Sequence, residues 1–519
     1  LLRKRYRSRA LDVVVPMLDA VGSKDKVDEN GRRLAPLKAE ILAQAYILGG
    51  RIELARGNGW WARRLFLKAE KIDKEKERKA RALYLAGEAM KRIKLYTRAE
   101  KHYKKVLARF PDSQQAAGAL YKLAQIAKKR SKPRLARERR RRVLDEYPMS
   151  WFARKVAWDM GYQQYKEKNW INAANSFALF CRIAPKDRSY PGVRYWQAKA
   201  LSQNKASKEV ERALKAIFKK PLPGLYHLAA ARYLKDMEDG SPSKKGLPMP
   251  DFGEYKKYLH LLRNQVPRRP RNGWCSLSGV LKGNALERIR ILKRAELFEC
   301  LSDNLGRLLR EAPSSGPLRN NLAWALERQG EFPASLEQGE IVLKREEPFK
   351  DIEKELILDK LFPRPARLPF RKFASRYGIN RRIAYAVARE ESRFDGGLIS
   401  WAGAKGVMQV MNPTGRWICK ELGIANFHPK KLYDPKLSVH LGSWYLAHLL
   451  ERFESLRDGE LLAISSYNAG PGNMSRWLKR FDGRGGFEAF VETWHLQETK
   501  FYVKKVVRAL LCYELLDSP

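Results

Sequence analysis

A 37-residue period limits what the first part of this chain can fold into. A proline recurs at the same place in each period, at Pro111, Pro148 and Pro185. An alanine stands twelve residues before each proline and once more one period earlier, at Ala62, Ala99, Ala136 and Ala173. Between alanine and proline the apolar residues follow helical spacing. Because proline cannot continue a helix, each unit is predicted to be a helix, a short turn and a second helix.

One helical hairpin cannot bury its apolar stripe alone, so successive hairpins are expected to stack into an α-solenoid. The unit resembles tetratricopeptide-like (TPR-like) repeats, with a slightly longer period. A further hairpin is predicted at residues 320–348. The fold class is therefore mostly α.

Two stretches rich in helix-breaking residues predict the domain organisation. The first lies within residues 237–284 and predicts a break between sub-blocks of the repeat region. The second has three prolines within residues 361–370 and predicts the main boundary. We therefore expect an α-superhelical repeat region over 1–362 and a separate C-terminal domain over 363–519.

The charge of the chain points to an acidic partner without naming it. Lys and Arg number 104 against 57 Asp and Glu, a formal net charge of +47. Such a field favours nucleic acid, anionic lipid or an acidic cell-wall polymer. The arginine-rich run 137–142 is predicted to lie on a solvated face, and a basic track for an acidic polymer is the alternative.

Several classes of protein are disfavoured. The five cysteines are scattered without a CxxC pair, and the histidines lack metal-ligand spacing, so neither a metal nor a cofactor is expected. No run of 18 apolar residues is present, which predicts no transmembrane segment. The chain begins LLRKRYRSRALDVVVP, without Met and without the apolar core of a signal peptide. A removed leader and a chain that never carried one both fit this start.

The candidate chemistry lies in the second domain, where a helical stretch ends in AREESRFD. On a helical wheel, Glu391 falls inside the apolar arc of Ile383, Val387 and Phe394, whereas Glu390 falls on its edge. Apolar surroundings and the negative end of the helix dipole both disfavour a carboxylate, so the pKa of Glu391 is expected to rise. A carboxyl that keeps its proton near neutrality can act as a general acid. A structural, ion-paired glutamate is the alternative from the wheel alone.

A second catalytic carboxylate is not evident. Asp395 shares a face with Glu391, but it directly precedes Gly396 and Gly397, which are predicted to stop the helix. Asp395 is therefore predicted to be a helix-end residue. The side chain of Glu390 projects away from that of Glu391, because neighbours in a helix point in different directions.

Four blocks of this domain resemble the lysozyme-like soluble lytic transglycosylases of glycoside hydrolase family 23. The blocks are AVAREESRFD, GAKGVMQVM, SSYNAGPGNMSRW and ETKFYVKKVV, and they stand in the family's order. Soluble members also carry a long α-superhelical region before the catalytic domain, which agrees with the repeats. The resemblance implies a lysozyme-like α domain over 363–519.

The resemblance also implies roles for particular residues. The glutamate directly before the serine is the catalytic acid of the family, which is Glu391 in this chain. Further positions match the sugar-binding groove and its surroundings: Ser392, Ser400, Gln409, Met411, Tyr467, Asn468, Glu498 and Tyr502.

The implied reaction cleaves the β-1,4 bond between N-acetylmuramic acid and N-acetylglucosamine in peptidoglycan and leaves 1,6-anhydro ends. Glu391 acts first as acid and then as base, a departure from the two-carboxylate scheme. The implied partners are peptidoglycan glycan strands, with the solenoid as a surface for cell-wall synthesis or remodelling proteins. Nucleic acid is not expected as a partner. The implied location is the periplasm.

Two alternatives stay open. One is a hydrolytic muramidase on the same scaffold, which uses water in place of the sugar hydroxyl. The other is a basic repeat scaffold that binds a polyanion or a protein partner and has an inactive C-terminal domain.

Overall fold

The structure is a computed structural model of the 519-residue chain. It describes residues 39–204, 206–219, 222–238, 273–345, 354–365, 368–456, 458–481, 486–494 and 497–517. The chain divides into two compact units, residues 1–210 and 211–519. The predicted sub-block break at 237–284 lies largely outside the described residues. The boundary at 362/363 remains a prediction, since the division into compact units falls elsewhere.

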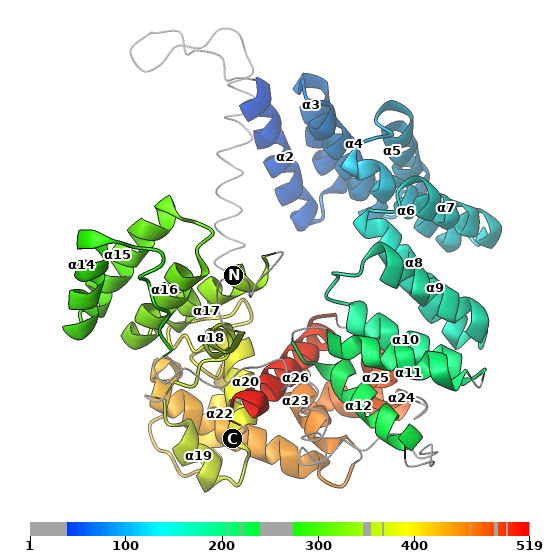
Figure 1. The fold of residues 1–519 in the computed structure, drawn as a ribbon. Coiled ribbons are helices and arrows are strands. Elements are labelled where there is room, and N and C mark those ends of the chain that lie inside the picture. The colour runs from blue at the N-terminus through cyan, green and yellow to red at the C-terminus, as the bar shows by residue number, and fades with distance from the viewer. Residues whose placement is uncertain are drawn as a thin grey trace, which may run out of the picture. The chain divides into compact units, whose positions relative to one another are not determined.

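The first unit is a run of helical hairpins in which each helix packs on the next (Figure 1). Its helices are α2 (Ala39–Arg56), α3 (Gly59–Ile72), α4 (Lys76–Arg92), α5 (Tyr96–Arg109), α6 (Gln114–Lys129), α7 (Pro133–Glu146), α8 (Trp151–Lys166), α9 (Trp170–Ile183) and α10 (Tyr190–Ser202), followed by α11 (Ser207–Lys215), which crosses the division between the units.

The predicted period is confirmed at the level of single positions. The repeated alanine is the fourth residue of α3, α5, α7 and α9 and is buried in each of them. Each repeated proline lies in the turn between one hairpin and the next. The mostly α fold class is thereby confirmed for this unit.

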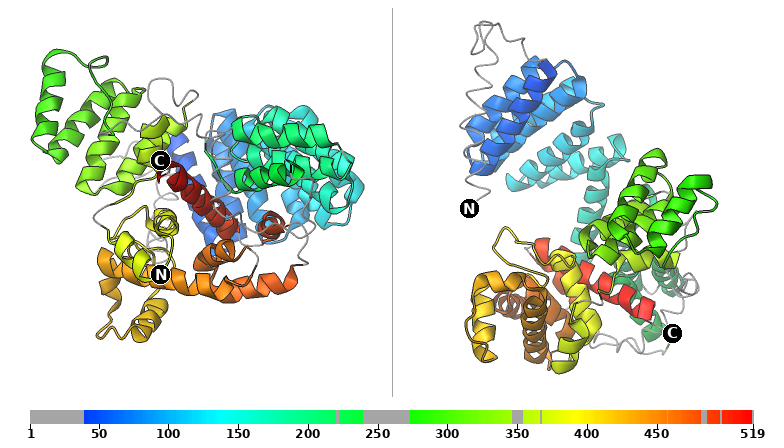
Figure 2. Two further views of the ribbon diagram at one scale, coloured as in Figure 1. Left: turned by 60° about the horizontal axis from the view of Figure 1, so that its bottom comes forward. Right: turned by 90° about the vertical axis from the view of Figure 1, so that its left-hand side faces the viewer.

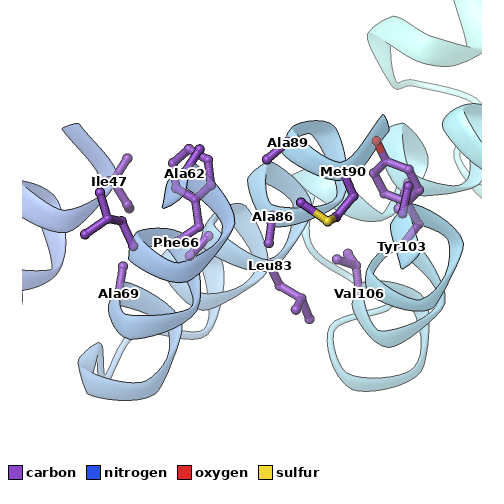
Figure 3. Packing of buried hydrophobic residues seen from close by; sticks show 14 of the residues in the cluster. Ile47, Ala62, Phe66, Ala69, Leu83, Ala86, Ala89, Met90, Tyr103 and Val106 are labelled. Atoms are coloured by element: carbon purple, nitrogen blue, oxygen red, sulfur yellow. The ribbon is translucent and has the colours of Figure 1, made fainter. Parts of the chain in front are cut away.

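A glycine opposite an aromatic ring sets how closely the two helices of a hairpin approach. A Cβ atom added to the glycine would lie 2.5 to 2.7 Å from a ring carbon in three pairs, which are Gly50 with Phe66, Gly87 with Tyr103, and Gly161 with Phe177. Figure 3 shows Phe66 and Tyr103 in the apolar cluster between successive helices. Each ring fills the space that the missing side chain leaves, which is the close packing expected of a protein interior.

The arginine-rich run lies on α7 and is partly paired within the repeats. Arg139 donates to the Leu123 carbonyl at 2.7 Å and lies 3.5 Å from Glu100. Arg142 pairs with Glu146 at 2.6 Å. Local partners therefore offset part of the positive charge of this run.

The second unit is also helical. It contains η1 (Ala216–Lys219), α12 (Leu225–Glu238), α14 (Gly283–Arg294), α15 (Phe298–Glu311), α16 (Gly316–Gln329), α17 (Phe332–Leu343), α18 (Lys354–Leu361), α19 (Phe370–Arg376), α20 (Arg381–Ser392), α21 (Asn412–Glu421), η2 (Pro429–Tyr433), α22 (Pro435–Phe453), α23 (Gly459–Ala469), α24 (Pro471–Arg480), α25 (Gly486–Thr493) and α26 (Gln497–Asp517). Within the described residues, isolated β-bridges join Ile399 to Lys405 and Lys405 to Val410.

Helix α26 is the centre of the packing around the candidate site. It lies against α20 and α23, and α18 also packs on it (Figure 1, Figure 2). Its residues Val503, Val506, Val507 and Leu510 are fully buried.

The hairpin α16–α17 confirms the predicted helical pair near 320–348 as far as Arg345. Among the helices described, none is long and apolar enough to cross a membrane.

Two neighbouring glycines of α2 test the helix contact. Gly50→Ala should lower the free energy of unfolding by about 1–3 kcal/mol, because the new methyl group meets the Phe66 ring at 2.5 Å. Gly49→Ala is the matched control, since its Cβ would make an ordinary 3.5 Å contact with Leu65 and should add about 0.5–1 kcal/mol. Thermal unfolding of both variants measures the difference. Equal midpoints would contradict the packing argument.

Candidate active site

Glu391 lies in the last turn of α20, with most of the helix surface buried beneath it. Ile383, Val387 and Ala388 of this helix are buried, and Glu391 itself keeps partial exposure. Burial raises the pKa of Glu391 to about 8, and the negative charges of Glu390 and Glu498 act in the same direction. The Tyr502 hydroxyl acts against them. The side chain therefore holds its proton at neutral pH and lies close to a group that stabilises its anion.

Two tyrosines approach Glu391 from other helices. Tyr467 comes from α23 and Tyr502 from α26, and burial followed by the charge of Glu391 raises the pKa of both hydroxyls. The Tyr467 hydroxyl donates to the Met408 carbonyl at 2.9 Å. The Tyr502 hydroxyl is buried and has no partner of normal hydrogen-bond geometry among the described residues. Tyr502 is thus available to the Glu391 carboxyl or to a ligand.

The other nearby carboxylates have structural partners. Glu390 contacts Arg389, and its second oxygen lies 3.9 Å from Lys505. Asp395 accepts a hydrogen bond from the Gly397 amide at 2.8 Å and so forms a turn after the helix. The helix-end interpretation of Asp395 agrees with this contact.

The end of α20 differs from the sequence prediction. The helix stops at Ser392, before the glycines at 396 and 397 that were expected to end it. Arg393 and Phe394 instead take left-handed backbone conformations, with φ of 56° and 66°. Such conformations are uncommon for residues other than glycine and cost free energy. The last helical turn, which carries Glu391, is capped by Arg393, whose backbone amide donates to the Arg389 carbonyl at 3.1 Å.

Ser392 ties this helix to the loop that follows. Its hydroxyl is buried and donates to the Val407 carbonyl at 2.6 Å. It also lies 3.3 Å from the Ala388 carbonyl. Ser392 therefore positions the loop, and no free hydroxyl is presented to a ligand.

Residues 398–411 form a turn that is held by hydrogen bonds within its own backbone and by the side chain of Gln409. Gln409 is buried, has a φ of 48°, and donates its amide to the Gly406 and Leu398 carbonyls at 2.8 and 3.1 Å. A Cβ atom at Gly406 would lie 2.0 Å from the Leu432 carbonyl oxygen, so only glycine fits there. The structure thus turns the Gln409 amide inward, toward the backbone of the loop.

The outer edge of this turn is apolar and exposed. Ser400 accepts a hydrogen bond from the Ala404 amide at 3.0 Å. Next to it, Trp401 is 83% exposed, the largest exposed fraction among the described large apolar side chains. Ile399 and Met411 are 53% and 39% exposed. Trp401 was not among the residues predicted from the sequence, although an aromatic residue beside Ser400 in a Gly- and Ala-rich loop is a usable signal.

The remaining predicted residues join α23 to α26. Asn468 accepts a hydrogen bond from the Thr499 hydroxyl at 2.8 Å. Glu498 directly precedes Thr499, is exposed, and is close enough to influence Glu391. The structure therefore brings Tyr467, Glu498 and Tyr502 around Glu391, while Ser392 and Gln409 support the loop beside it.

The arrangement suits proton transfer by a carboxyl group. Glu391 can hold a proton near neutrality, and Tyr502 can stabilise the anion that remains after the proton is given away. Within the described part of the chain, no three His, Cys, Asp or Glu side chains come together in a way that could hold a metal ion.

Comparison with known proteins finds a domain match for the part of the chain that contains Glu391. Residues 369–490 match the family model of the transglycosylase SLT domain. The complex of a 70-kDa soluble lytic transglycosylase with bulgecin A has a similar fold, with a TM-score of 0.51 and 18% identity over 99% of this chain and 85% of that one. The chain thus contains a match to the SLT domain, and its fold is similar to that of the soluble lytic transglycosylase in this complex.

Particular relatives are bacterial. Over 165 residues the chain is 33% identical to the soluble lytic murein transglycosylase of Escherichia coli K12. This match covers 31% of this chain and 25% of that protein. Over 319 residues it is 25% identical to the Salmonella typhimurium LT2 protein of the same name, covering 60% and 42%. The matches therefore span between a quarter and less than half of these relatives.

The protonation of Glu391 can be tested through stability. Between its usual pKa of 4.5 and about 8, the folded chain keeps a proton that the unfolded chain releases, so rising pH favours unfolding. Glu391→Gln removes this effect. The variant should gain thermal stability relative to wild type as the pH rises from about 5 to about 8.

Glu390→Gln is the control, because it breaks the contacts with Arg389 and Lys505 but leaves the burial of Glu391 in place, so the gain should be much smaller than in Glu391→Gln. A difference between Glu391→Gln and wild type that stays constant across this pH range would show that Glu391 ionises normally.

Proposed function

We propose that this protein is a lytic transglycosylase that cleaves the β-1,4 bond between N-acetylmuramic acid and N-acetylglucosamine of peptidoglycan. The observation that carries the proposal is the Glu391 carboxyl in an SLT domain, with a pKa raised to about 8 and two tyrosine hydroxyls beside it. In this proposal, Ser400, Met411, Tyr467, Asn468 and Glu498 border the glycan. Ser392 and Gln409 hold the loop that carries the first two.

In the first step, Glu391 gives its proton to the glycosidic oxygen as the bond to the muramic acid carbon breaks. The leaving N-acetylglucosamine departs with a neutral hydroxyl, and positive charge develops on the muramic acid ring. The ring's own N-acetyl group supports this charge, as in other substrate-assisted cleavages. Glu391 is now an anion, and the Tyr502 hydroxyl lies close enough to stabilise it.

In the second step, the Glu391 carboxylate takes the proton of the 6-hydroxyl of the same muramic acid. The oxygen of that hydroxyl bonds to the anomeric carbon and closes a 1,6-anhydro ring. Glu391 returns to its protonated form, and no water is consumed. One carboxyl is sufficient for both steps, which agrees with the structural contacts of Glu390 and Asp395.

The net charge of +47 supports the same substrate, because peptidoglycan carries carboxylates on its lactyl and peptide groups. We infer that the protein works in the periplasm, where this polymer lies, and that glycan strands are its main partner. The helical repeats are the proposed surface for cell-wall synthesis or remodelling proteins.

Glu391→Gln should abolish release of products from purified sacculi while leaving the helical content unchanged, since the amide has no proton to give.

For wild type, kcat should fall as the pH rises above about 8, because Glu391 loses its proton there. Mass spectrometry of the products distinguishes the mechanisms. Anhydro ends support the proposal, and reducing ends indicate a hydrolytic muramidase. If wild type cleaves no glycan, the remaining alternative is a repeat scaffold that binds a partner and has an inactive C-terminal domain.

Trp401 should contribute a sugar-binding surface at the edge of the site, because the face of an aromatic ring packs well against the apolar face of a sugar. Trp401→Ala should raise KM by about 3–10-fold with little change in kcat, and Trp401→Phe should restore most of the loss. Trp151→Ala, at an exposed tryptophan of α8, is the control and should leave KM unchanged. An unchanged KM for Trp401→Ala would remove this residue from the site.

A further inference from the structure

Three residues that flank Glu391 are held by segments outside the matched SLT domain. These residues are Arg389, Arg393 and Phe394, which lie within three positions of Glu391 in the chain. Each of them has a partner on α17 or at the end of α18, before residue 363. The matched domain begins only at residue 369. The last turn of the acid-bearing helix thus depends on helices of the preceding region of the same unit.

The first contact is an ion pair between Arg393 and Glu340 of α17. One guanidinium nitrogen donates to both carboxylate oxygens, at 3.0 and 3.2 Å. The two side chains are 46% and 30% exposed. A pair this exposed contributes little to global stability. Its main physical effect is therefore to fix where Arg393 lies.

The second contact is aromatic. Phe394 is buried and packs edge to face against Phe332 at the start of α17, with ring centroids 5.8 Å apart. Its other neighbour is Phe370 at 6.1 Å. Left-handed conformations at non-glycine residues persist only where the surroundings hold them. Glu340 and Phe332 supply such surroundings for the two residues that end α20.

The third contact is on the other side of Glu391. Arg389 donates to the Leu361 carbonyl at 2.6 Å, and its guanidinium lies over the Phe362 ring at 4.6 Å from the centroid. Leu361 and Phe362 are both buried. The helix is thus held two residues before Glu391 as well as two and three residues after it.

We propose that α17, together with residues 361 and 362, clamps the last turn of α20, and that Glu340 and Phe332 are positioning residues for the Glu391 carboxyl. The proposal rests on Glu391 as the proton donor. Neither residue needs to touch the glycan. The clamp acts by keeping the carboxyl at the distance from the glycosidic oxygen that proton transfer requires, where small displacements cost much of the rate.

A double-mutant cycle tests the clamp in the full chain. Glu340→Ala and Arg393→Ala should each lower kcat by about 10-fold with KM unchanged, and the double variant should be no worse than either single variant. Glu340→Asp keeps the charge and should recover part of kcat. Glu70→Ala is the matched control, because the Glu70–Arg109 pair also links two helices, at 2.7 Å, and should leave kcat unchanged.

The pH dependence and the second contact provide independent readouts. Loosening the clamp lets water reach the carboxyl, so the loss of kcat at alkaline pH should move to lower pH in Glu340→Ala. Phe332→Leu keeps an apolar contact but loses the ring, and it should lower kcat in the same way.

Wild-type kcat in both Glu340→Ala and Arg393→Ala would overturn the clamp, and so would additive losses or a loss confined to KM. Failure of the underlying function is a separate result. In that case Glu391→Gln would retain wild-type cleavage, whatever the Glu340 variants do.

Discussion

A carboxyl group that must keep its proton at neutral pH and still give it away sets the requirements of this site. Burial alone would make Glu391 a poor source of the anion that the second step uses, because the charged form would be too costly. Full exposure would release the proton too early. In the structure, burial raises the pKa of Glu391, and the Tyr502 hydroxyl lowers it. Both depend on α20 and α26 lying together, and α23 adds the second tyrosine.

The helical repeats meet a simpler requirement, which is to stack one hairpin on the next. Small residues at fixed positions, such as Ala62 and Gly50, let neighbouring helices approach closely, and an aromatic ring fills the space. This packing buries apolar residues along the first unit and leaves charged side chains outside. The arginine-rich part of α7 shows the consequence, because its arginines pair with acidic residues of the repeats.

Features that depend on neighbours in the chain were predictable from the sequence, and features that depend on distant contacts were not. The repeat period marked the hairpins and their buried alanines, because both follow from local spacing. The helical wheel predicted an apolar environment for Glu391 and a position at the edge of that environment for Glu390. The predicted end of α20 was wrong, because Arg393 and Phe394, which follow the helix, are held by side chains of α17. The inward turn of Gln409 likewise depends on carbonyl groups of a folded loop. The roles of these residues in catalysis stay predictions.

The same distinction explains why the compact units do not follow the proline-rich boundary. Prolines at 361–370 interrupt a helix, but an interruption of a helix does not require an interruption of packing. Leu361 and Phe362 are buried beside that stretch, and Tyr513 of α26 donates to the Pro363 carbonyl at 2.9 Å. Residues that the sequence assigns to the repeat region therefore form part of the surroundings of α20 and α26. A repeat that packs on the acid-bearing helix can influence the chemistry without any catalytic side chain of its own.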